Sequence, residues 1–337
     1  MKKWMLVLLL VVATGLLVVP GLISAWLPGQ LRQSLEESWP DAMPVIQRGW
    51  FSTSLTARSP TEQLDLTFQH VPWWQGAWLT GTGELRLTEP AGVIALDGRL
   101  GGLGLLEIQA SSTGMRWTSQ APNQIGNLEI QLSGLRGQGL KLSANATTMV
   151  FSDPLGNQLK LQDVHIDSDW RWIDEATRGW HVTIDSQRPN QPASRLSMQW
   201  STIDAAAAAS LMESLGEMNR AAPDSLQAQM AGLGLLSAWQ QLVQSGLTLE
   251  PSTLNLDQQF QLEGQWQPKV RNLNLQGGGP IVIALDWLTP ILGLNQQIRP
   301  NQAREQAWSM MAAGEEQGLL RIADEQLEWI ATETRTP

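Results

Sequence analysis

Residues 48–203 alternate between apolar and polar side chains in about ten short segments, and this pattern constrains the fold more than any other feature. A strand with one buried face has this period of two, because successive side chains point to opposite faces of a sheet. Gly, Pro, Asn or Ser separates the segments, as in antiparallel sheets. Long apolar runs do not alternate with helices here, which disfavours a doubly wound parallel sheet. The pattern predicts an α+β, β-dominated fold with a long, twisted, groove-like antiparallel sheet.

Three of these segments show the alternation clearly. Their apolar positions are Leu159 and Leu161; Trp180, Val182 and Ile184; and Leu196, Met198 and Trp200. Between Leu161 and Val164 the phase slips by one residue, which predicts a bulge or a strand end at Gln162–Asp163.

The composition changes at residue 204, where a run of alanines begins. Asp204 is a suitable helix cap, and Gly246 is a suitable helix end. We therefore predict a helical insert over 204–246. Strand-like alternation returns in 247–337, a β-rich region that ends in a helix and a terminal hairpin.

Residues 4–27 contain no charged side chain, and 24 residues of helix can cross a bilayer core of about 30 Å. Lys2 and Lys3 precede this stretch, so the positive-inside bias predicts a cytoplasmic tip at 1–3 and an exported body. Trp4 and Trp26 lie at the two membrane interfaces in this interpretation. Residues 28–47 then form a stalk. Together these features predict a single-pass protein of a bacterial inner membrane, with its bulk in the periplasm.

A cleaved signal peptide is the alternative interpretation of residues 4–27. The apolar part is longer than the roughly 7–15 residues usual for a signal peptide, and the boundary lacks a clean A-x-A site. Ile23-Ser24-Ala25 imitates such a site, so both interpretations stay open. The body lies outside the inner membrane in either case.

The net charge of −10 and the absence of Lys/Arg clusters exclude nucleic acid as a partner, because an acidic body is repelled by phosphate backbones. The chain has no cysteine, which excludes thiolate ligands and a thiol nucleophile. It has 17 Trp and no Tyr, an aromatic usage suited to filling a core or lining a cavity.

Short motifs spread along the chain resemble those of a known family. The first motif, RGWFST at 48–53, follows the apolar N-terminal stretch. The second, LDLTFQHVP at 64–72, comes soon after the first, and the third, GLTLEPSTLNL at 246–256, comes after the helical insert. This order resembles the YdgA-like family of inner-membrane-anchored periplasmic proteins of unassigned function. Val71 stands where the family has glycine in its HGP motif. The resemblance implies a retained anchor and a periplasmic body, and it brings no catalytic residues.

Two apolar surfaces are candidates for a ligand or a partner. Trp73, Trp74 and Trp78 lie in a loop after a strand, where they stack on sugar rings, dip into the membrane interface or plug the end of the sheet. Leu235, Leu236 and Trp239 belong to an apolar stripe of the second helix of the insert.

The sequence predicts no catalytic residue, no cofactor and no metal. The three histidines lack metal-ligand spacing, and His70 is expected to be hydrogen-bonded at a strand end. The acidic residues of 163–175 are expected in a solvated turn, because an EF-hand order is missing. The glycines of 277–279 are expected in a hinge or tight turn, because no Lys-Ser/Thr follows them.

Two hypotheses of function follow. The first is a tethered, non-catalytic protein of the cell envelope that binds a hydrophobic or lipid-like component in a β-groove. The second is a structural or assembly module that docks another envelope or secretion protein, with the helical insert as its docking element. An enzyme is a distant third.

Overall fold

The computed structural model describes residues 27–33, 42–49, 51–70, 79–88, 90–101, 105–117, 123–135, 138–220, 225–270, 272–330 and 332–334. The chain divides into two compact units. Unit 1 comprises residues 1–136 and 140–150, and unit 2 comprises residues 137–139 and 151–337.

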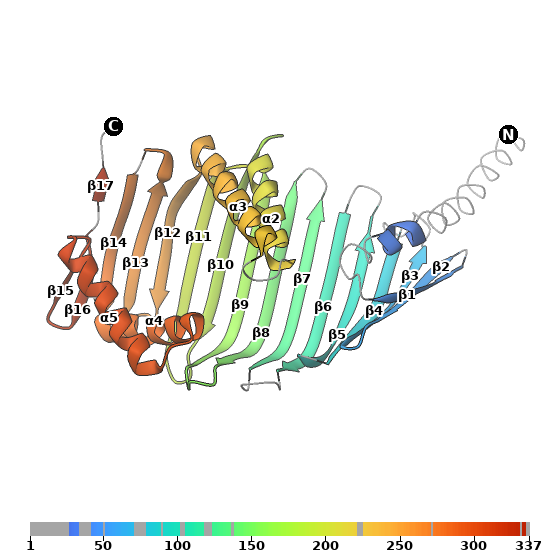
Figure 1. Ribbon diagram of the computed structural model, residues 1–337, viewed down its shortest axis with the longest axis horizontal. Coiled ribbons are helices and arrows are strands. Elements are labelled where there is room, and N and C mark those ends of the chain that lie inside the picture. Colours follow the sequence, from blue (N-terminus) through green and yellow to red (C-terminus); the bar gives the residue numbers. More distant parts are fainter. Residues whose placement is uncertain are drawn as a thin grey trace, which may run out of the picture. The chain divides into compact units, whose positions relative to one another are not determined.

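Unit 1 is an antiparallel meander, in which each strand from β1 to β6 pairs with the next one along the chain (Figure 1). The strands are β1 (Met43–Arg48), β2 (Ser52–Arg58), β3 (Glu62–His70), β4 (Leu79–Thr88), β5 (Ala91–Leu100), β6 (Leu105–Arg116), β7 (Gln124–Leu135) and β8 (Gly139–Ser152). The predicted alternation is confirmed by the exposed–half-buried pattern of strands such as β5. His70 is 2% exposed at the end of β3, where its Nε2 lies 3.2 Å from Thr53 Oγ1, as expected.

The segment expected as a stalk contains regular structure. Residues 27–33 are helical, and β1 pairs with β2 from Met43↔Arg58 to Arg48↔Thr53. The strand region therefore begins five residues earlier than the predicted boundary at 48, because Val45 and its neighbours complete the ladder of β2.

The strands of unit 2 are also antiparallel, and within the described residues they belong to the same 17-stranded sheet. The unit 2 strands are β9 (Gln158–Trp172), β10 (Thr177–Gln187), β11 (Ala193–Asp204), β12 (Thr248–Leu256), β13 (Phe260–Gln267), β14 (Asn272–Pro280), β15 (Leu320–Ala323), β16 (Gln326–Trp329) and β17 (Thr332–Thr334). Consecutive strands pair from β9 to β14, β14 also pairs with β16 and β17, and β15 pairs with β16.

The predicted bulge in β9 is confirmed. Asp185 pairs with His165 while Gln187 pairs with Gln162, so β9 has one residue too many opposite Ser186. Asp163 takes the left-handed conformation, with φ of 49°, at this point.

Two sequence-based predictions for unit 2 are wrong. The acidic segment expected as a turn is mostly strand, because β9 continues to Trp172 with Asp167 and Asp169 on its outer side. Gly277–Gly279 form no hinge, because they lie in β14 between β13 and β16. An ideal Cβ on Gly278 would lie 1.9 Å from the carbonyl oxygen of Leu327. Glycine at this position therefore allows the two strands to approach each other closely.

The helical insert has the expected bounds. It consists of α2 (Ala205–Arg220) and α3 (Leu226–Ser245). Asp204 Oδ1 accepts a hydrogen bond from the N–H of Ala207 at 2.8 Å, which confirms the predicted cap. Gly246 ends α3 in the left-handed conformation with φ of 99°.

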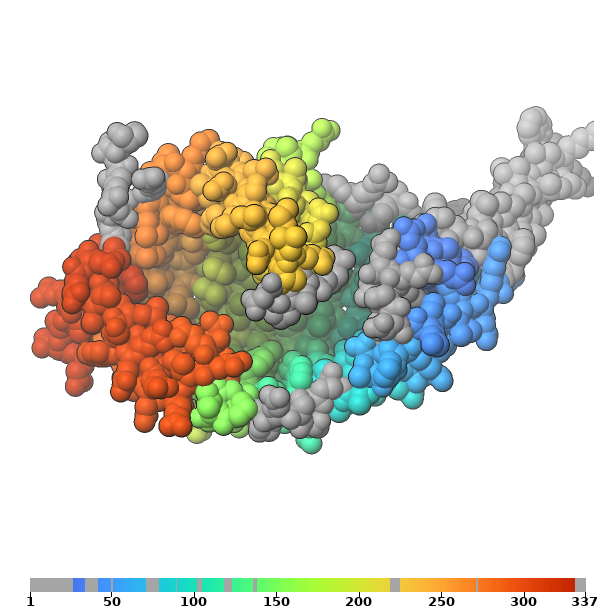
Figure 2. Space-filling view, viewed as in Figure 1, coloured from blue at the N-terminus to red at the C-terminus, as the bar shows by residue number. Residues whose placement is uncertain are grey.

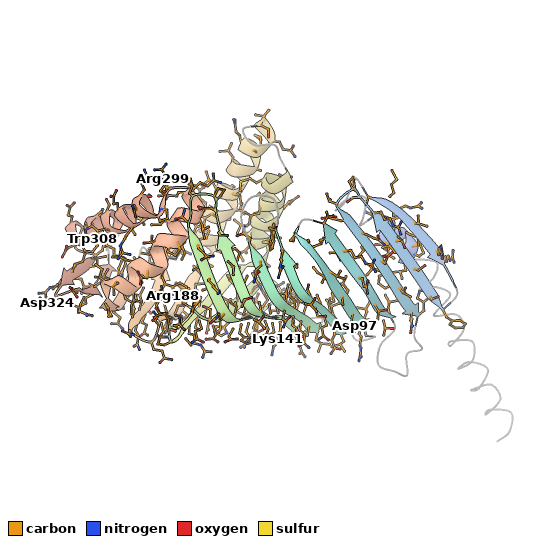
Figure 3. The ribbon with its side chains drawn as sticks, turned by 90° about the horizontal axis from the view of Figure 1, so that it is seen from below. Asp97, Lys141, Arg188, Arg299, Trp308 and Asp324 are labelled. Atoms are coloured by element: carbon orange, nitrogen blue, oxygen red, sulfur yellow. The ribbon has the colours of Figure 1, made fainter. Side chains whose placement is uncertain are left out.

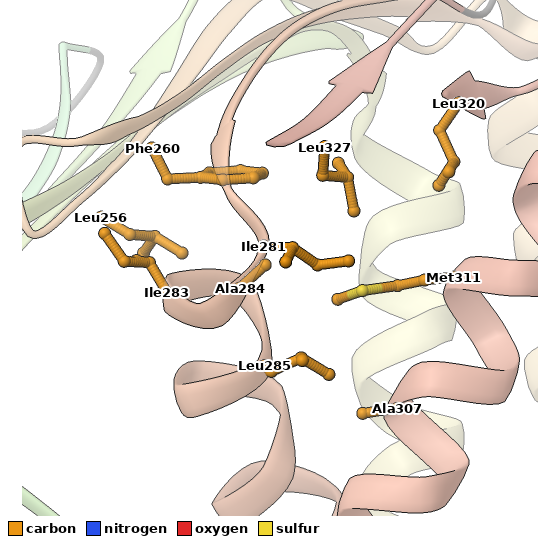
Figure 4. Packing of buried hydrophobic residues seen from close by; sticks show 10 residues of the cluster. All are labelled: Leu256, Phe260, Ile281, Ile283, Ala284, Leu285, Ala307, Met311, Leu320 and Leu327. Carbon is orange, nitrogen blue, oxygen red and sulfur yellow. The ribbon is translucent and has the colours of Figure 1, made fainter. Parts of the chain in front are cut away.

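The second pair of helices, α4 (Ile281–Gln296) and α5 (Pro300–Glu316), follows β14, and a short 3-10 helix, η2 (Pro268–Val270), precedes β14. Figure 4 shows residues of α4 and α5 packed against side chains from the strands. The buried members of this core are Leu256, Phe260, Ile281, Ile283, Ala284, Leu285, Ala307, Met311, Leu320 and Leu327. Seen from below in Figure 3, both helix pairs stand on the same side of the unit 2 strands.

Among the described residues, no single helix combines the length and the hydropathy of a membrane span. The helices α4 and α5 meet that standard only as a pair, and the two are bent by 116°. Residues 1–26, which include Trp4, Trp26 and nearly all of the expected anchor, lie outside the described residues. The anchor and the inner-membrane location therefore stay predictions.

Candidate functional site: an apolar cavity in unit 2

A cavity of about 630 Å³ lies between the strands and the α4–α5 pair. The strands supply its floor: Leu159, Leu161, Ile184, Ser186, Ser194, Leu196, Leu254, Leu256, Phe260 and Leu262. The floor exists because these residues share one phase of the alternation. Ile184 faces Leu196, Leu196 faces Leu254 and Leu254 faces Leu262 in the strand registers, so four aliphatic side chains form one row across four strands.

The helices and the terminal hairpin supply the remaining walls: Ala284, Trp287, Leu288 and Ile291 of α4, Met310 and Met311 of α5, and Leu320, Leu327 and Trp329. Ile291 and Met310 are 45% and 54% exposed, so apolar side chains mark the rim. Figure 2 shows the face recessed between the α2–α3 and α4–α5 pairs, with yellow-green strands at the bottom of the hollow. A concave, mostly apolar site of this size falls in the usual range for a small-molecule pocket.

A buried ion pair contacts two residues that line the cavity. The carboxylate of Asp257 is fully buried and pairs with the guanidinium of Arg188. Ser194 donates to Asp257 Oδ1 at 3.1 Å and accepts from the Asp257 N–H at 2.7 Å. The indole N–H of Trp287 is 3.4 Å from the same Oδ1. Asp257 therefore fixes two residues of the cavity wall, Ser194 from the floor and Trp287 from the roof.

The backbone at Asp257 is adapted to this position. Asp257 and Gln258 have φ of 50° and 57°, and the N–H of Gln259 bonds to the carbonyl of Leu256. Two successive left-handed residues are the mark of a type I′ hairpin turn, which usually contains Asn or Gly. Asp at this position gives the turn a carboxylate that reaches Arg188, 69 residues away in the chain.

The guanidinium of Arg188 is held by its neighbours, although its Nε has no hydrogen-bond partner among the described residues. Its guanidinium carbon lies 5.2 Å from the ring centroid of Trp287, and its Nη1 lies 4.0 Å from Asp286 Oδ2. Arg195 contributes to the cavity lining from β11, but it alternates with Ser194 and Leu196, so its side chain belongs to the opposite face. There it is 63% exposed and pairs with Asp185 at 3.5 Å. Neither cation is free to neutralise a charge in the cavity.

The predicted surface residues of α3 do not line this cavity. Leu236 is 60% exposed, Leu235 is half-buried, and Trp239 stacks on Trp266 of β13 with ring centroids 6.1 Å apart. Trp73, Trp74 and Trp78 lie outside the described residues. Sequence reasoning identified the aliphatic floor but missed Ser186, Ser194 and Asp257. The signal available for the serines was their place in an otherwise apolar phase of β10 and β11.

A smaller apolar cavity of about 330 Å³ lies in unit 1. Its lining from β3 to β6 includes Leu66, Phe68, Leu96, Leu100 and Ile108, of which Leu100 and Ile108 are 41% and 39% exposed. It has half the volume of the unit 2 cavity and a more exposed lining, so the unit 2 cavity is the stronger candidate site.

A loop between β8 and β9 supports the roof of the cavity. Asn157 is 3% exposed and donates to the carbonyl of Ile298, just after α4. Asp153 holds Asn157 in place by accepting from its amide at 2.6 Å and from its N–H at 2.9 Å. Desolvation raises the pKa of Asp153, but the hydrogen bonds from Asn157, Leu155 and Gly156 outweigh it and lower the pKa below its ordinary value.

We expect this loop to lose its contribution to stability in acid. A carboxyl whose pKa is lowered by folding stabilises the fold above the unfolded-state pKa of about 4, and that stabilisation disappears as the pH falls through the folded-state pKa. Asp153→Asn removes the titrating group. Urea midpoints for wild type and variant should therefore differ at pH 7 and converge towards pH 3. A difference that stays constant with pH would contradict this role.

Within the described ranges, no three His, Asp or Glu side chains gather in a geometry that could hold a metal ion. Comparisons with protein-family models, with curated proteins and with solved structures found no match for this chain.

Proposed function

We propose that this chain is a membrane-tethered, non-catalytic protein of the cell envelope that holds a hydrophobic or lipid-like molecule in the unit 2 cavity. The observation that carries the proposal is the cavity of about 630 Å³, whose floor, roof and rim are almost entirely apolar. Filling such a cavity with hydrocarbon is favourable by about 0.8 kcal/mol for each methylene removed from water. The wider groove predicted from the sequence is part of the same proposal.

The location belongs to this proposal as well. The apolar stretch at 4–27 and the lysines before it support an inner-membrane anchor with a periplasmic body. The resemblance to the YdgA-like family supports the same location. A tethered protein with an apolar cavity would keep its ligand close to the membrane from which such a molecule partitions.

The proposal is tested by blocking the cavity. The full chain, purified in an amphipathic polymer and extracted with organic solvent, should release a bound lipid that mass spectrometry identifies. The double variant Leu196→Trp and Leu254→Trp fills the central row of the floor, and exclusion of two methylenes should lower occupancy by about tenfold or more. The matched control is Leu233→Trp, because Leu233 is 62% exposed on α3. Absence of lipid from the wild type, or equal occupancy in all three proteins, would count against the proposal.

The alternative, a module that docks another envelope protein through the helical insert, stays a prediction. Leu226, Met230, Leu233 and Leu236 of α3 are 60–74% exposed, so this helix does present apolar side chains to solvent. The cavity-blocking variants distinguish the two hypotheses, because they alter the floor of the sheet and leave α3 unchanged.

A further inference from the structure

One polar side chain of the cavity has no partner. Ser186 of β10 is 8% exposed and belongs to the cavity lining. In the part of the chain that the structure describes, its hydroxyl makes no hydrogen bond, whereas Ser194 beside it is bonded twice to Asp257. The hydroxyl oxygen itself is still accessible from the cavity. An occupant can therefore supply the hydrogen-bond partner that the described residues do not.

The local backbone explains why Ser186 is free. On one side its neighbour is Ser194, whose hydroxyl is committed to Asp257. On the other side the β9 bulge falls between the pairs Asp185↔His165 and Gln187↔Gln162, so two β9 residues lie opposite Ser186 and neither is in register with it. The bulge and the ion pair together keep this hydroxyl available to a ligand.

The charges around the cavity limit what that ligand can be. The guanidinium of Arg188 is engaged by Asp257, Asp286 and Trp287, and the side chain of Arg195 lies on the opposite face with Asp185. An ionised group inside the cavity would lose its hydration without gaining a cation, which is strongly unfavourable. A neutral oxygen group on a hydrocarbon needs only one hydrogen bond.

We propose that Ser186 anchors the ligand, and that the ligand is a long hydrocarbon bearing a neutral oxygen function, such as an alcohol or an ester, and not a carboxylate. This inference rests on the proposed function, since it names the class of molecule that the same cavity takes. The hydrocarbon fills the aliphatic floor around Leu196 and Leu254, and its oxygen group bonds to the Ser186 hydroxyl.

The test uses the full chain in an amphipathic polymer, stripped of lipid, with three tritiated 16-carbon probes at pH 8: hexadecanol, palmitate and hexadecane. Wild type should bind hexadecanol at least about tenfold more tightly than palmitate, because the carboxylate is ionised. Ser186→Ala should weaken hexadecanol binding about fivefold, the usual net value of one hydrogen bond, and leave hexadecane binding unchanged. Ser186→Thr keeps the hydroxyl and should retain hexadecanol binding.

The control is Ser252→Ala on β12, a serine of similar burial (9% exposed) that bonds to the carbonyl of Glu250 and does not line the cavity. Stripped Ser186→Ala should unfold thermally at or above the wild-type temperature, because the substitution breaks no hydrogen bond within the described part of the protein. A lower unfolding temperature would show a structural role and overturn the inference.

Two further results would overturn the inference while the proposed function stands: equal hexadecanol binding by wild type and Ser186→Ala, or palmitate binding as tight as hexadecanol binding. Failure of wild type to bind any of the three probes would overturn the proposed function itself, and the inference with it.

Discussion

Replacing Asp257 with Ala should lower the free energy of unfolding by about 3–5 kcal/mol, the range measured when one partner of a buried ion pair is removed. The carboxylate is fully buried, and the guanidinium of Arg188, which it neutralises, is largely buried too. The variant leaves that guanidinium without its main partner and frees Ser194 and Trp287. Urea unfolding followed by circular dichroism measures the change, and hydrogen exchange should place it in unit 2.

Two companion variants make the Asp257 prediction specific. Arg188→Met combined with Asp257→Leu removes both charges, and it should recover much of the lost stability, because apolar residues of similar size often replace a buried pair well. Asp169→Ala breaks a surface pair with Arg171, whose side chain is 70% exposed, and should change stability by less than about 1 kcal/mol. A double variant as unstable as Asp257→Ala would contradict the charge-based explanation.

Replacing Gly278 with Ala should cost about 3 kcal/mol, the upper end of the range for overpacking. The added methyl would meet backbone: its ideal position is 1.9 Å from the carbonyl oxygen of Leu327 and 3.0 Å from the Cα of Glu328. Backbone cannot move aside as a side-chain tip does, so the pairing of β14 with β16 has to open. Leu327, 1% exposed in the core, would lose its packing with that strand.

The matched control for Gly278→Ala is a glycine-to-alanine substitution that we expect to raise the stability of the protein. Gly232 lies in α3, and apart from the backbone of that helix no heavy atom lies within 4 Å of an added Cβ. Because Ala is favoured over Gly in a helix interior, Gly232→Ala should stabilise the protein by up to about 1 kcal/mol. Thermal unfolding compares the two variants directly. Equal effects of the two substitutions would show that the close approach at β14 is not the cause.

Local sequence features were sufficient wherever the structure depends on near neighbours. The phases of Trp180–Ile184 and Leu196–Trp200 predicted the apolar face that supplies Ile184 and Leu196 to the cavity, because the side-chain period of a strand is set by its own backbone. The slip at Gln162–Asp163 predicted the bulge for the same reason. Asp204 and Gly246 predicted the ends of the insert, because capping bonds span three or four residues.

Features that depend on contacts between distant segments could not be predicted from the sequence. The run at 277–279 contains the glycines expected of a turn, and only the close approach of Gln261 and Leu327 makes it a strand. Nothing in the sequence around Asp257 indicates that Arg188 lies next to it in the structure. In the sequence Ser186 is an ordinary strand serine. Only the structure shows that the bulge in β9 and the hydrogen bonds of Ser194 leave the Ser186 hydroxyl without a partner among the described residues.

The sequence by itself determined a β-dominated, antiparallel chain with a helical insert and one apolar face. The reason is that strand alternation and helix caps depend only on residues that are close together in the chain. The tertiary structure alone decided that α4 and α5 cover that face without filling it, and so leave a cavity. The physical reason is that a cavity is a property of how well two surfaces fit, and each surface comes from a different part of the chain.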